Sequence, residues 1–382
     1  MKFFIIQPNL TSNSETWLSR INIMLENNIC GFAAFMEKPG FFKQLEVFNL
    51  NGRQPDFIER SFIRMRLNKY NLQQTMRREL FRKIRKSGAE ALLIQYATTA
   101  QYLWDVVGHF SMPVFIYVHG YDIIWDHNND VGQRIHGSDY PHQILKIAQQ
   151  PNVSFIVNSD CSCQSLLDIG IDPSKIIKKN FGVTIPVINR TFNNASLNVL
   201  FLGRFVDYKG PDIVLKAFIK ACSLGFSGNL VMAGDGSLKK ECEEIAKDSG
   251  YADRISFTGV VNAEEALELF KAADIYSMHN CKGLVSKGYD TFGVTIIEAL
   301  SFGLPVITSM VGGAAEIIEN GVDGILVQPG NVDEHASAFM KLYQNRSYCY
   351  LLSNNGKKKV EAKYSSQLEK EALFRILNIN QS

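Results

Sequence analysis

The chain has 382 residues, of which 46% are apolar and 20% are charged, and its formal net charge at neutral pH is +2. At roughly 100–200 residues per domain the length suggests two domains, and the balanced charge argues against a nucleic-acid coat or a disordered chain. No apolar run reaches the ~18 residues of a membrane span, and Pro8 interrupts the first apolar run too early for a secretory signal.

The first half of the chain alternates short apolar runs with helix-like stretches. Strands are expected at residues 3–7, 91–95, 114–119 and 154–158, and a helix at residues 15–26. This alternation is typical of a parallel sheet covered by helices.

A basic stretch, residues 60–86, holds ten basic residues and one acidic residue. Apolar residues recur in it every four positions, which predicts a helix with one apolar face: Leu72, Met76, Leu80 and Ile84. The opposite face, with Arg78, Arg82 and Arg85, could dock on anionic lipid headgroups or simply face water. Nucleic acid is a poorer option, because no aromatic stacking platform accompanies the stretch.

The second half restarts the alternation after a polar segment, residues 184–196, which we expect to be an interdomain linker. Strands are expected at 198–202, 229–233, 255–258, 275–277, 306–308 and 325–327, and helices at 212–221, 238–247, 264–272, 294–302 and 314–319. The sequence therefore predicts two α/β domains, each a doubly wound parallel sheet, at 1–183 and 197–360. A helix within 361–382 is expected to pack back on the first domain. Ligands in such sheets bind beyond the carboxyl ends of the strands, which here would face a cleft between the domains.

The loop after the first strand of the second domain carries two cations. Gly203 allows the chain to turn, and Arg204 and Lys209 lie five residues apart, where both can reach one anion. Gly210 then precedes a helix, whose N-terminus adds partial positive charge. The alternative is an ordinary strand–helix loop with two solvated cations.

A second candidate lies around the helix that begins after Gly293. Asp290 precedes this helix and Glu298 lies inside it, eight residues later. Two carboxylates so placed can accept hydrogen bonds from a polyhydroxylated ligand, and the free amides near Gly293 and Val294 can hold a phosphate. The alternative for Glu298 is an exposed helix charge, which its apolar neighbours disfavour.

These motifs together resemble the family-four retaining glycosyltransferases of GT-B fold. The resemblance rests on Gly-Arg-x5-Gly from Gly203 to Gly210, on Asp290-x7-Glu298 and on Gly312-Gly313-x-x-Glu316, in matching order over residues 198–330. It implies two Rossmann-like domains facing a cleft. It also implies that Arg204 and Lys209 bind the diphosphate of a nucleotide-sugar, that Glu298 holds the ribose, and that Asp290 lies near the donor sugar.

The resemblance extends more weakly to the first domain. The segment Ser14-Glu15-Thr16-Trp17 resembles a turn after the first strand, and His119-Gly120-Tyr121-Asp122 resembles the family's His-Gly-x-Asp segment, whose His lies beside the reacting sugar. The expected catalytic residues are thus His119, Arg204, Lys209 and Asp290. The expected donor site comprises Gly203, Arg204, Lys209, Gly234, Asp290, Phe292, Gly293, Val294 and Glu298. The expected acceptor side comprises Glu15, Thr16, His119, Gly120 and Asp122.

The expected activity is transfer of a hexosyl-type sugar from a nucleoside-diphosphate sugar to an acceptor hydroxyl with retention of configuration. The resemblance suggests assembly of cell-surface polysaccharide or lipopolysaccharide on a glycan or lipid-linked acceptor. No metal or other cofactor is expected, because no Asp-x-Asp occurs and the two cations with the helix amides can balance the diphosphate. Seven cysteines without a Cys-x-x-Cys pair indicate reduced thiols in a cytoplasmic protein, peripheral on the membrane's inner face if the basic stretch docks there. The alternatives are a nucleotide-sugar epimerase of the same architecture and a non-catalytic nucleotide-sugar or glycan-binding protein.

Overall fold

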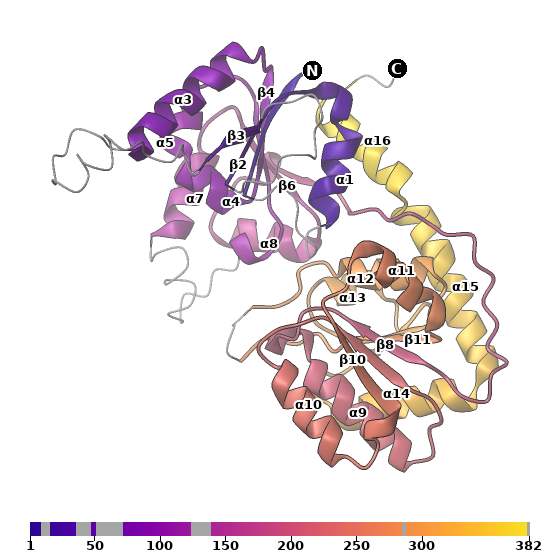
Figure 1. Cartoon of the computed structure of the whole chain (residues 1–382). Helices are drawn as coiled ribbons and strands as arrows, with labels where there is room; N and C mark the ends of the chain where they lie inside the picture. Colours follow the sequence, from indigo (N-terminus) through magenta and orange to yellow (C-terminus); the bar gives the residue numbers. More distant parts are fainter. Residues whose placement is uncertain (9–15, 36–46, 51–71, 124–138, 285–287, 380–382) are drawn as a thin grey trace, which may run out of the picture.

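The computed structural model describes residues 1–8, 16–35, 47–50, 72–123, 139–284 and 288–379. Within these ranges the chain forms two α/β units, each built on one parallel sheet (Figure 1). The predicted fold class is therefore confirmed. Residues 184–196 run between the two sheets without a helix or strand.

The N-terminal sheet has the strand order β3-β2-β1-β4-β5-β6-β7, and its neighbouring strands are parallel. Its strands are β1 (Phe3–Gln7), β2 (Ile29–Ala34), β3 (Val47–Asn49), β4 (Ala91–Gln95), β5 (Val114–Tyr117), β6 (Val153–Val157) and β7 (Ile176–Lys178). Its helices are α1 (Thr16–Met24), α3 (Leu72–Lys86), α4 (Ala97–Tyr102), α5 (Trp104–Val107), α7 (Tyr140–Ala148) and α8 (Asp160–Asp168).

The C-terminal sheet has the order β10-β9-β8-β11-β12-β13 and is also parallel. Its strands are β8 (Val199–Leu202), β9 (Leu230–Ala233), β10 (Ile255–Gly259), β11 (Ile275–Ser277), β12 (Val306–Ser309) and β13 (Ile325–Val327). Its helices are α9 (Pro211–Ser223), α10 (Lys239–Asp248), α11 (Ala263–Ala272), α12 (Val294–Ser301), α13 (Gly313–Ile317), α14 (Val332–Gln344) and α15 (Arg346–Lys363).

Both faces of the N-terminal sheet are buried, which explains the continuous apolar runs of its central strands. In β1, Phe3 and Ile5 join one core cluster, whereas Phe4 and Ile6 point to the other face and join a second one. The first of these clusters continues without interruption into the core of the C-terminal domain. The two sheets are therefore connected through packed apolar side chains as well as through the linker.

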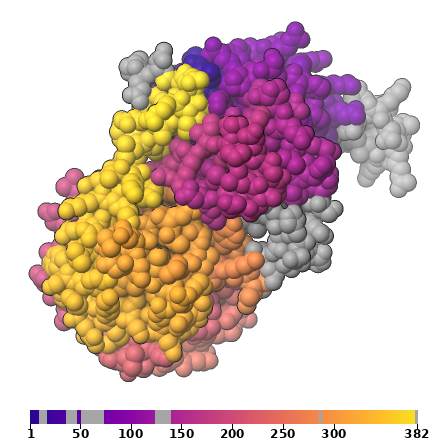
Figure 2. Space-filling model, turned by 180° about the vertical axis from the view of Figure 1, so that it is seen from behind, coloured from indigo at the N-terminus to yellow at the C-terminus, as the bar shows by residue number. Residues whose placement is uncertain are grey.

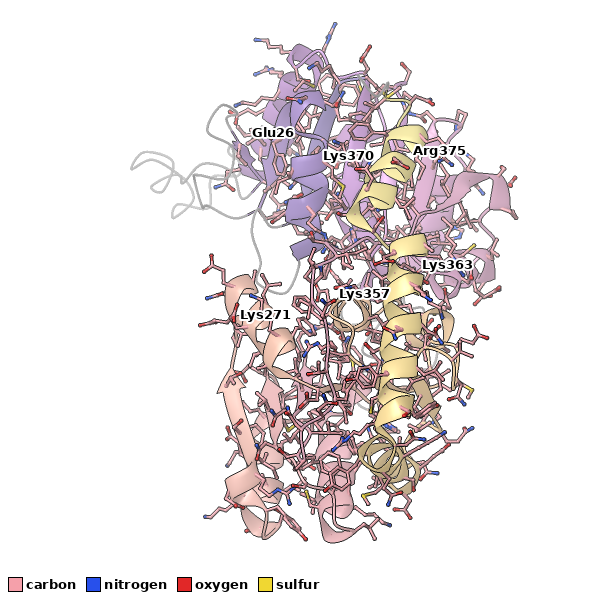
Figure 3. All side chains as sticks on the ribbon, turned by 90° about the vertical axis from the view of Figure 1, so that its right-hand side faces the viewer. Glu26, Lys271, Lys357, Lys363, Lys370 and Arg375 are labelled. Carbon is pink, nitrogen blue, oxygen red and sulfur yellow. The ribbon has the colours of Figure 1, made fainter. Side chains whose placement is uncertain are left out.

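The last helix, α16 (Ser366–Ile376), returns to the N-terminal domain. Figure 2 shows the C-terminal segment, in yellow, lying against both domains. In Figure 3, Lys357 and Lys363 lie on α15, beside the C-terminal domain, while Lys370 and Arg375 lie on α16, beside the N-terminal one. The fully buried Lys179 anchors α16 through an ion pair of 2.5 Å with Glu369.

The basic stretch forms α3 from Leu72 onward, and residues 60–71 lie outside the described ranges. Met76, Leu80 and Ile84 are buried against the sheet. The arginines predicted for the opposite face, Arg78, Arg82 and Arg85, are exposed. No helix in the described part of the chain has an apolar run that could cross a bilayer.

Candidate active site

Glycines determine the conformation of the loop between β8 and α9, which carries Arg204 and Lys209. Gly210 has a positive φ of 56°, and a Cβ there would lie 2.3 Å from the carbonyl oxygen of His279. Gly234, at the end of β9, packs directly on this loop, because a Cβ there would lie 2.0 Å from the carbonyl oxygen of Gly203. These close backbone contacts hold the loop at the carboxyl edge of the sheet, where Pro211 begins α9.

The two cations of this loop lie beside Asp290. The Nζ atom of Lys209 forms an ion pair with Asp290, and both side chains are largely shielded from solvent. The exposed Arg204 donates a hydrogen bond to the hydroxyl group of Tyr208. Burial raises the pKa of Tyr208, and the charge of Asp290 adds to this effect. The structure thus brings Arg204, Lys209 and Asp290 together from two different loops. Lys209 and Asp290 are 81 residues apart in the sequence.

The start of α12 supplies free amides next to these charges. Gly293 adopts a left-handed conformation with φ of 90° before the helix begins at Val294, and its side-chain-free Cα lies close to Asp290 and Ile296. Burial raises the pKa of Glu298, one turn along α12, to about 7, and the positive charge of Arg20 partly offsets this effect. A carboxyl group with this pKa changes its ionisation near neutral pH.

His119 follows β5 and adjoins this site through its backbone carbonyl, which lies beside Thr291. Its Nε2 atom lies 2.7 Å from Oε1 of Gln95, and its ring stacks on Tyr117 at 4.7 Å between centroids. Burial, together with the charge of Lys179, lowers the pKa of His119 to about 3. The imidazole is therefore neutral at physiological pH and can exchange hydrogen bonds but carries no charge.

The segment that carries His119 is held from both domains. Asp122 is fully buried and accepts hydrogen bonds from the backbone N–H groups of Ala97, His119 and Gly120, at 2.8, 2.9 and 3.0 Å. Because these N–H groups engage both carboxylate oxygens, we assign Asp122 to positioning His119 rather than to ligand contact. From the C-terminal domain, the hydroxyl group of Thr291 donates to the carbonyl of His119 at 3.4 Å.

Gly120 is necessary for this approach between the domains, because a Cβ there would lie 2.3 Å from the Thr291 hydroxyl oxygen. The side chain of Phe292 is buried against Phe181, with ring centroids 5.3 Å apart, so it packs between the domains. Of the residues expected on the acceptor side, Glu15 lies outside the described residues, as does the side chain of Thr16, which begins α1.

Sequence reasoning missed a second contact between the domains. Glu316 on α13 accepts hydrogen bonds from the backbone N–H groups of Asp160 and Cys161, at 2.8 and 2.7 Å, and so caps α8 of the other domain. Lys178 supports this cap through an ion pair of 2.6 Å with Asp160. Figure 1 shows α12 and α13 on the side of the C-terminal domain that faces α8 and α1.

Comparison with known proteins agrees with this geometry. Residues 189–359 match the family model for glycosyl transferases group 1. An uncharacterized glycosyltransferase of Methanocaldococcus jannaschii is 32% identical over 167 residues, which are 44% of this chain and 41% of that protein. A GDP-mannose-dependent alpha-(1-6)-phosphatidylinositol monomannoside mannosyltransferase of Mycobacterium tuberculosis is 28% identical over 166 residues, 44% of this chain and 43% of that protein. The chain thus matches less than half the length of either curated relative.

The likeness to solved structures covers nearly the whole chain. The structure of Anabaena HepE in complex with UDP superposes with a TM-score of 0.77 at 17% identity, over 99% of this chain and 100% of that one. At this identity the likeness establishes a common two-domain GT-B fold. The match of residues 189–359 to the group 1 glycosyl transferases agrees with the resemblance that the motifs of this half carry.

Proposed function

We propose that this chain, whose residues 189–359 match the group 1 glycosyl transferases, is a retaining glycosyltransferase. It would transfer a hexosyl-type sugar from a nucleoside-diphosphate sugar to an acceptor hydroxyl. The observation that carries this proposal is the grouping of Arg204, Lys209 and Asp290 beside the first turn of α12, opposite His119. Cations and free amides at one point suit a diphosphate, and carboxylates suit sugar hydroxyls.

The chemical task is the departure of the diphosphate while the sugar gains positive charge. Arg204, Lys209 and the amides of α12 would stabilise the negative charge that develops on the leaving group. Glu298 and Asp290 would orient the ribose and the sugar, and the neutral His119 would line the acceptor side. We propose attack on the face from which the diphosphate leaves, with the diphosphate assisting proton removal, because these roles leave Asp290 and Glu298, the carboxylates described at the donor site, engaged in binding rather than free to act as a nucleophile.

The proposed charge balance uses protein groups and requires no metal. Lys209 and Arg204 are fixed cations, and a helix N-terminus adds partial positive charge that is already oriented before the reaction begins. A donor bound in this way needs no divalent ion to bridge its phosphates.

The proposed acceptor is a glycan or lipid-linked glycan used in cell-surface polysaccharide or lipopolysaccharide assembly, and the proposed location is cytoplasmic. The M. tuberculosis relative, named as a phosphatidylinositol monomannoside mannosyltransferase, supports a lipid-linked acceptor. The exposed arginines of α3 provide a surface that could bind anionic lipid headgroups. Sedimentation with vesicles tests this part: binding that is absent, or equal for neutral and anionic vesicles, would refute electrostatic docking.

A thermal-shift screen of nucleoside diphosphates and their sugars tests the activity first. A ligand at 100 times its dissociation constant should add about 2.7 kcal/mol of stability. The donor identified should then give a glycoside of retained configuration with a suitable acceptor, and Arg204→Ala should abolish transfer without unfolding the protein. Arg375→Ala, at an exposed position on α16, is the matched control.

Product analysis with a labelled donor separates the alternatives. An epimerase would release a free or isomerised sugar, and a binding protein would leave the donor intact. Normal transfer by the Arg204→Ala variant would contradict the proposed site.

A further inference from the structure

The guanidinium of Arg20 on α1 carries buried polar atoms that the described residues do not satisfy. Its Nε and Nη2 atoms are buried and have no hydrogen-bond partner within the described residues. Nε–H and the adjacent Nη2–H lie on one edge of the guanidinium, the edge that binds a carboxylate or phosphate through two parallel hydrogen bonds. Buried donors without acceptors are costly, so an edge left open in this way indicates a missing anionic ligand.

The surroundings of Arg20 include Trp17 on its own helix and Glu298 of the other domain, on which its charge acts. Trp17 lies three residues earlier, on the same side of α1, and its ring contacts His119 and Phe181, with centroids 6.0 and 5.8 Å away. The Nε1 atom of Trp17 is a further buried donor without a partner in the described chain. Across the interface, the charge of Arg20 acts on Glu298 of α12, whose pKa it lowers against the effect of burial.

No acidic group in the described chain neutralises Arg20. Lys179, the neighbouring cation, is paired with Glu369 at 2.5 Å. Glu298, on which the charge of Arg20 acts, has its pKa raised to about 7 by burial, so it is only partly ionised at neutral pH. On the opposite side of the site, Lys209 is already paired with Asp290. A diphosphate, whose negative charge grows as the sugar leaves, therefore meets fewer free cations than the loop sequence suggests.

We propose that the Nε–Nη2 edge of Arg20 binds oxygens of the donor's diphosphate, so that the N-terminal domain contributes a cation to the nucleotide site. The inference rests on the proposed function, because the expected contact of Glu298 with the ribose brings the phosphates close to Arg20. It gives the first domain a direct interaction with the donor, and it links donor binding to the contact between the domains.

The test compares the nucleoside diphosphate that the wild-type protein binds best with its parent nucleoside, by isothermal titration calorimetry. Arg20→Gln should weaken nucleoside diphosphate binding by roughly ten- to a hundredfold and leave nucleoside binding unchanged. Arg20→Lys, which keeps the charge but cannot form two parallel hydrogen bonds, should give an intermediate loss of nucleoside diphosphate affinity. Arg375→Gln, on the exposed side of α16, should bind both ligands like the wild type.

Diphosphate affinity within twofold of wild type in a folded Arg20→Gln variant would overturn the inference, as would an equal loss for the nucleoside. If the variants do not fold, modification of wild-type Arg20 by an arginine-specific dicarbonyl reagent replaces them. The diphosphate, but not the nucleoside, should then protect Arg20, and the absence of protection would refute the contact. A wild-type protein that binds no nucleoside diphosphate would instead refute the proposed function, and this inference with it.

Discussion

The buried ion pair between Lys179 and Glu369 makes a sharp prediction about stability. The side chains are 0% and 1% exposed, their charged atoms are 2.5 Å apart, and Glu369 also accepts a hydrogen bond from the Gly182 N–H at 3.0 Å. Glu369→Gln keeps the shape of the side chain but leaves the buried ammonium without a counter-charge. Breaking such a pair costs about 3–5 kcal/mol of unfolding free energy.

Urea unfolding followed by circular dichroism measures this loss. Glu361→Gln, the same substitution at an exposed position of α15, should stay within about 0.5 kcal/mol of wild type. The double variant Lys179→Met/Glu369→Leu, which removes both charges together, should recover most of the loss, because apolar replacements of a buried pair are often neutral. A loss below about 1 kcal/mol for Glu369→Gln, or a double variant no better than the single one, would refute the reasoning.

The stability of the Glu369→Gln variant should also depend on pH. Burial lowers the pKa of Lys179, while Glu369 counteracts this effect in the wild type. Without Glu369 the folded state loses the lysine proton at a lower pH than the unfolded state does. The unfolded state then binds more protons, so the stability of Glu369→Gln should rise as pH is increased through this range.

Three further predictions concern the site itself. Gly210→Ala should lose about 1–3 kcal/mol of unfolding free energy and weaken nucleotide binding, because its Cβ would meet the His279 carbonyl at positive φ. The control Gly225→Ala, also at positive φ but with nothing within 4 Å of its Cβ, should lose less stability and bind nucleotide normally. Equal losses of stability for the two variants in calorimetry would show that the contact is unimportant. Nucleoside affinity should fall as pH drops from about 8 to about 6, because ribose hydroxyls donate hydrogen bonds to the ionised form of Glu298. The affinity of the Glu298→Gln variant should not change over this range. A wild-type affinity that is independent of pH would exclude the contact of Glu298 with the ribose. Transfer activity should persist after exhaustive chelation with EDTA and dialysis, and activity restored only by added divalent ions would contradict charge balance by protein groups.

The sheets were largely predictable because burial on both faces leaves continuous apolar runs. The predicted ranges for β1, β4, β11 and β13 match the observed strands residue for residue. Three strands of the first sheet gave no such signal. β2 is interrupted by Gly31 and small side chains, and β3 and β7 are short, partly exposed strands at the two edges of the sheet.

The candidate site was predictable where local sequence carries the chemistry. Arg204 and Lys209 follow a strand, and Gly293 precedes a helix, so each was visible within a few residues. The contact of Glu316 depends on partners in the other domain, and the role proposed for Arg20 depends on its burial in the folded chain. Glu316 caps a helix 156 residues away, and the Gly312-Gly313-x-x-Glu316 motif in which it lies does not reveal that partner.

The return of α16 to the first domain has a consequence for the order of folding. The Val183–Ser365 bridge and the Lys179–Glu369 pair each join a segment that is translated before the second domain to one that is translated after it. While the ribosome is still translating residues 197–365, the buried ammonium of Lys179 has no counter-charge, and the packing of the nascent N-terminal domain is incomplete. Completion of the first domain therefore waits until Ser365 and Glu369 have been translated, which couples the maturation of both halves of the site to an event that follows synthesis of the second domain.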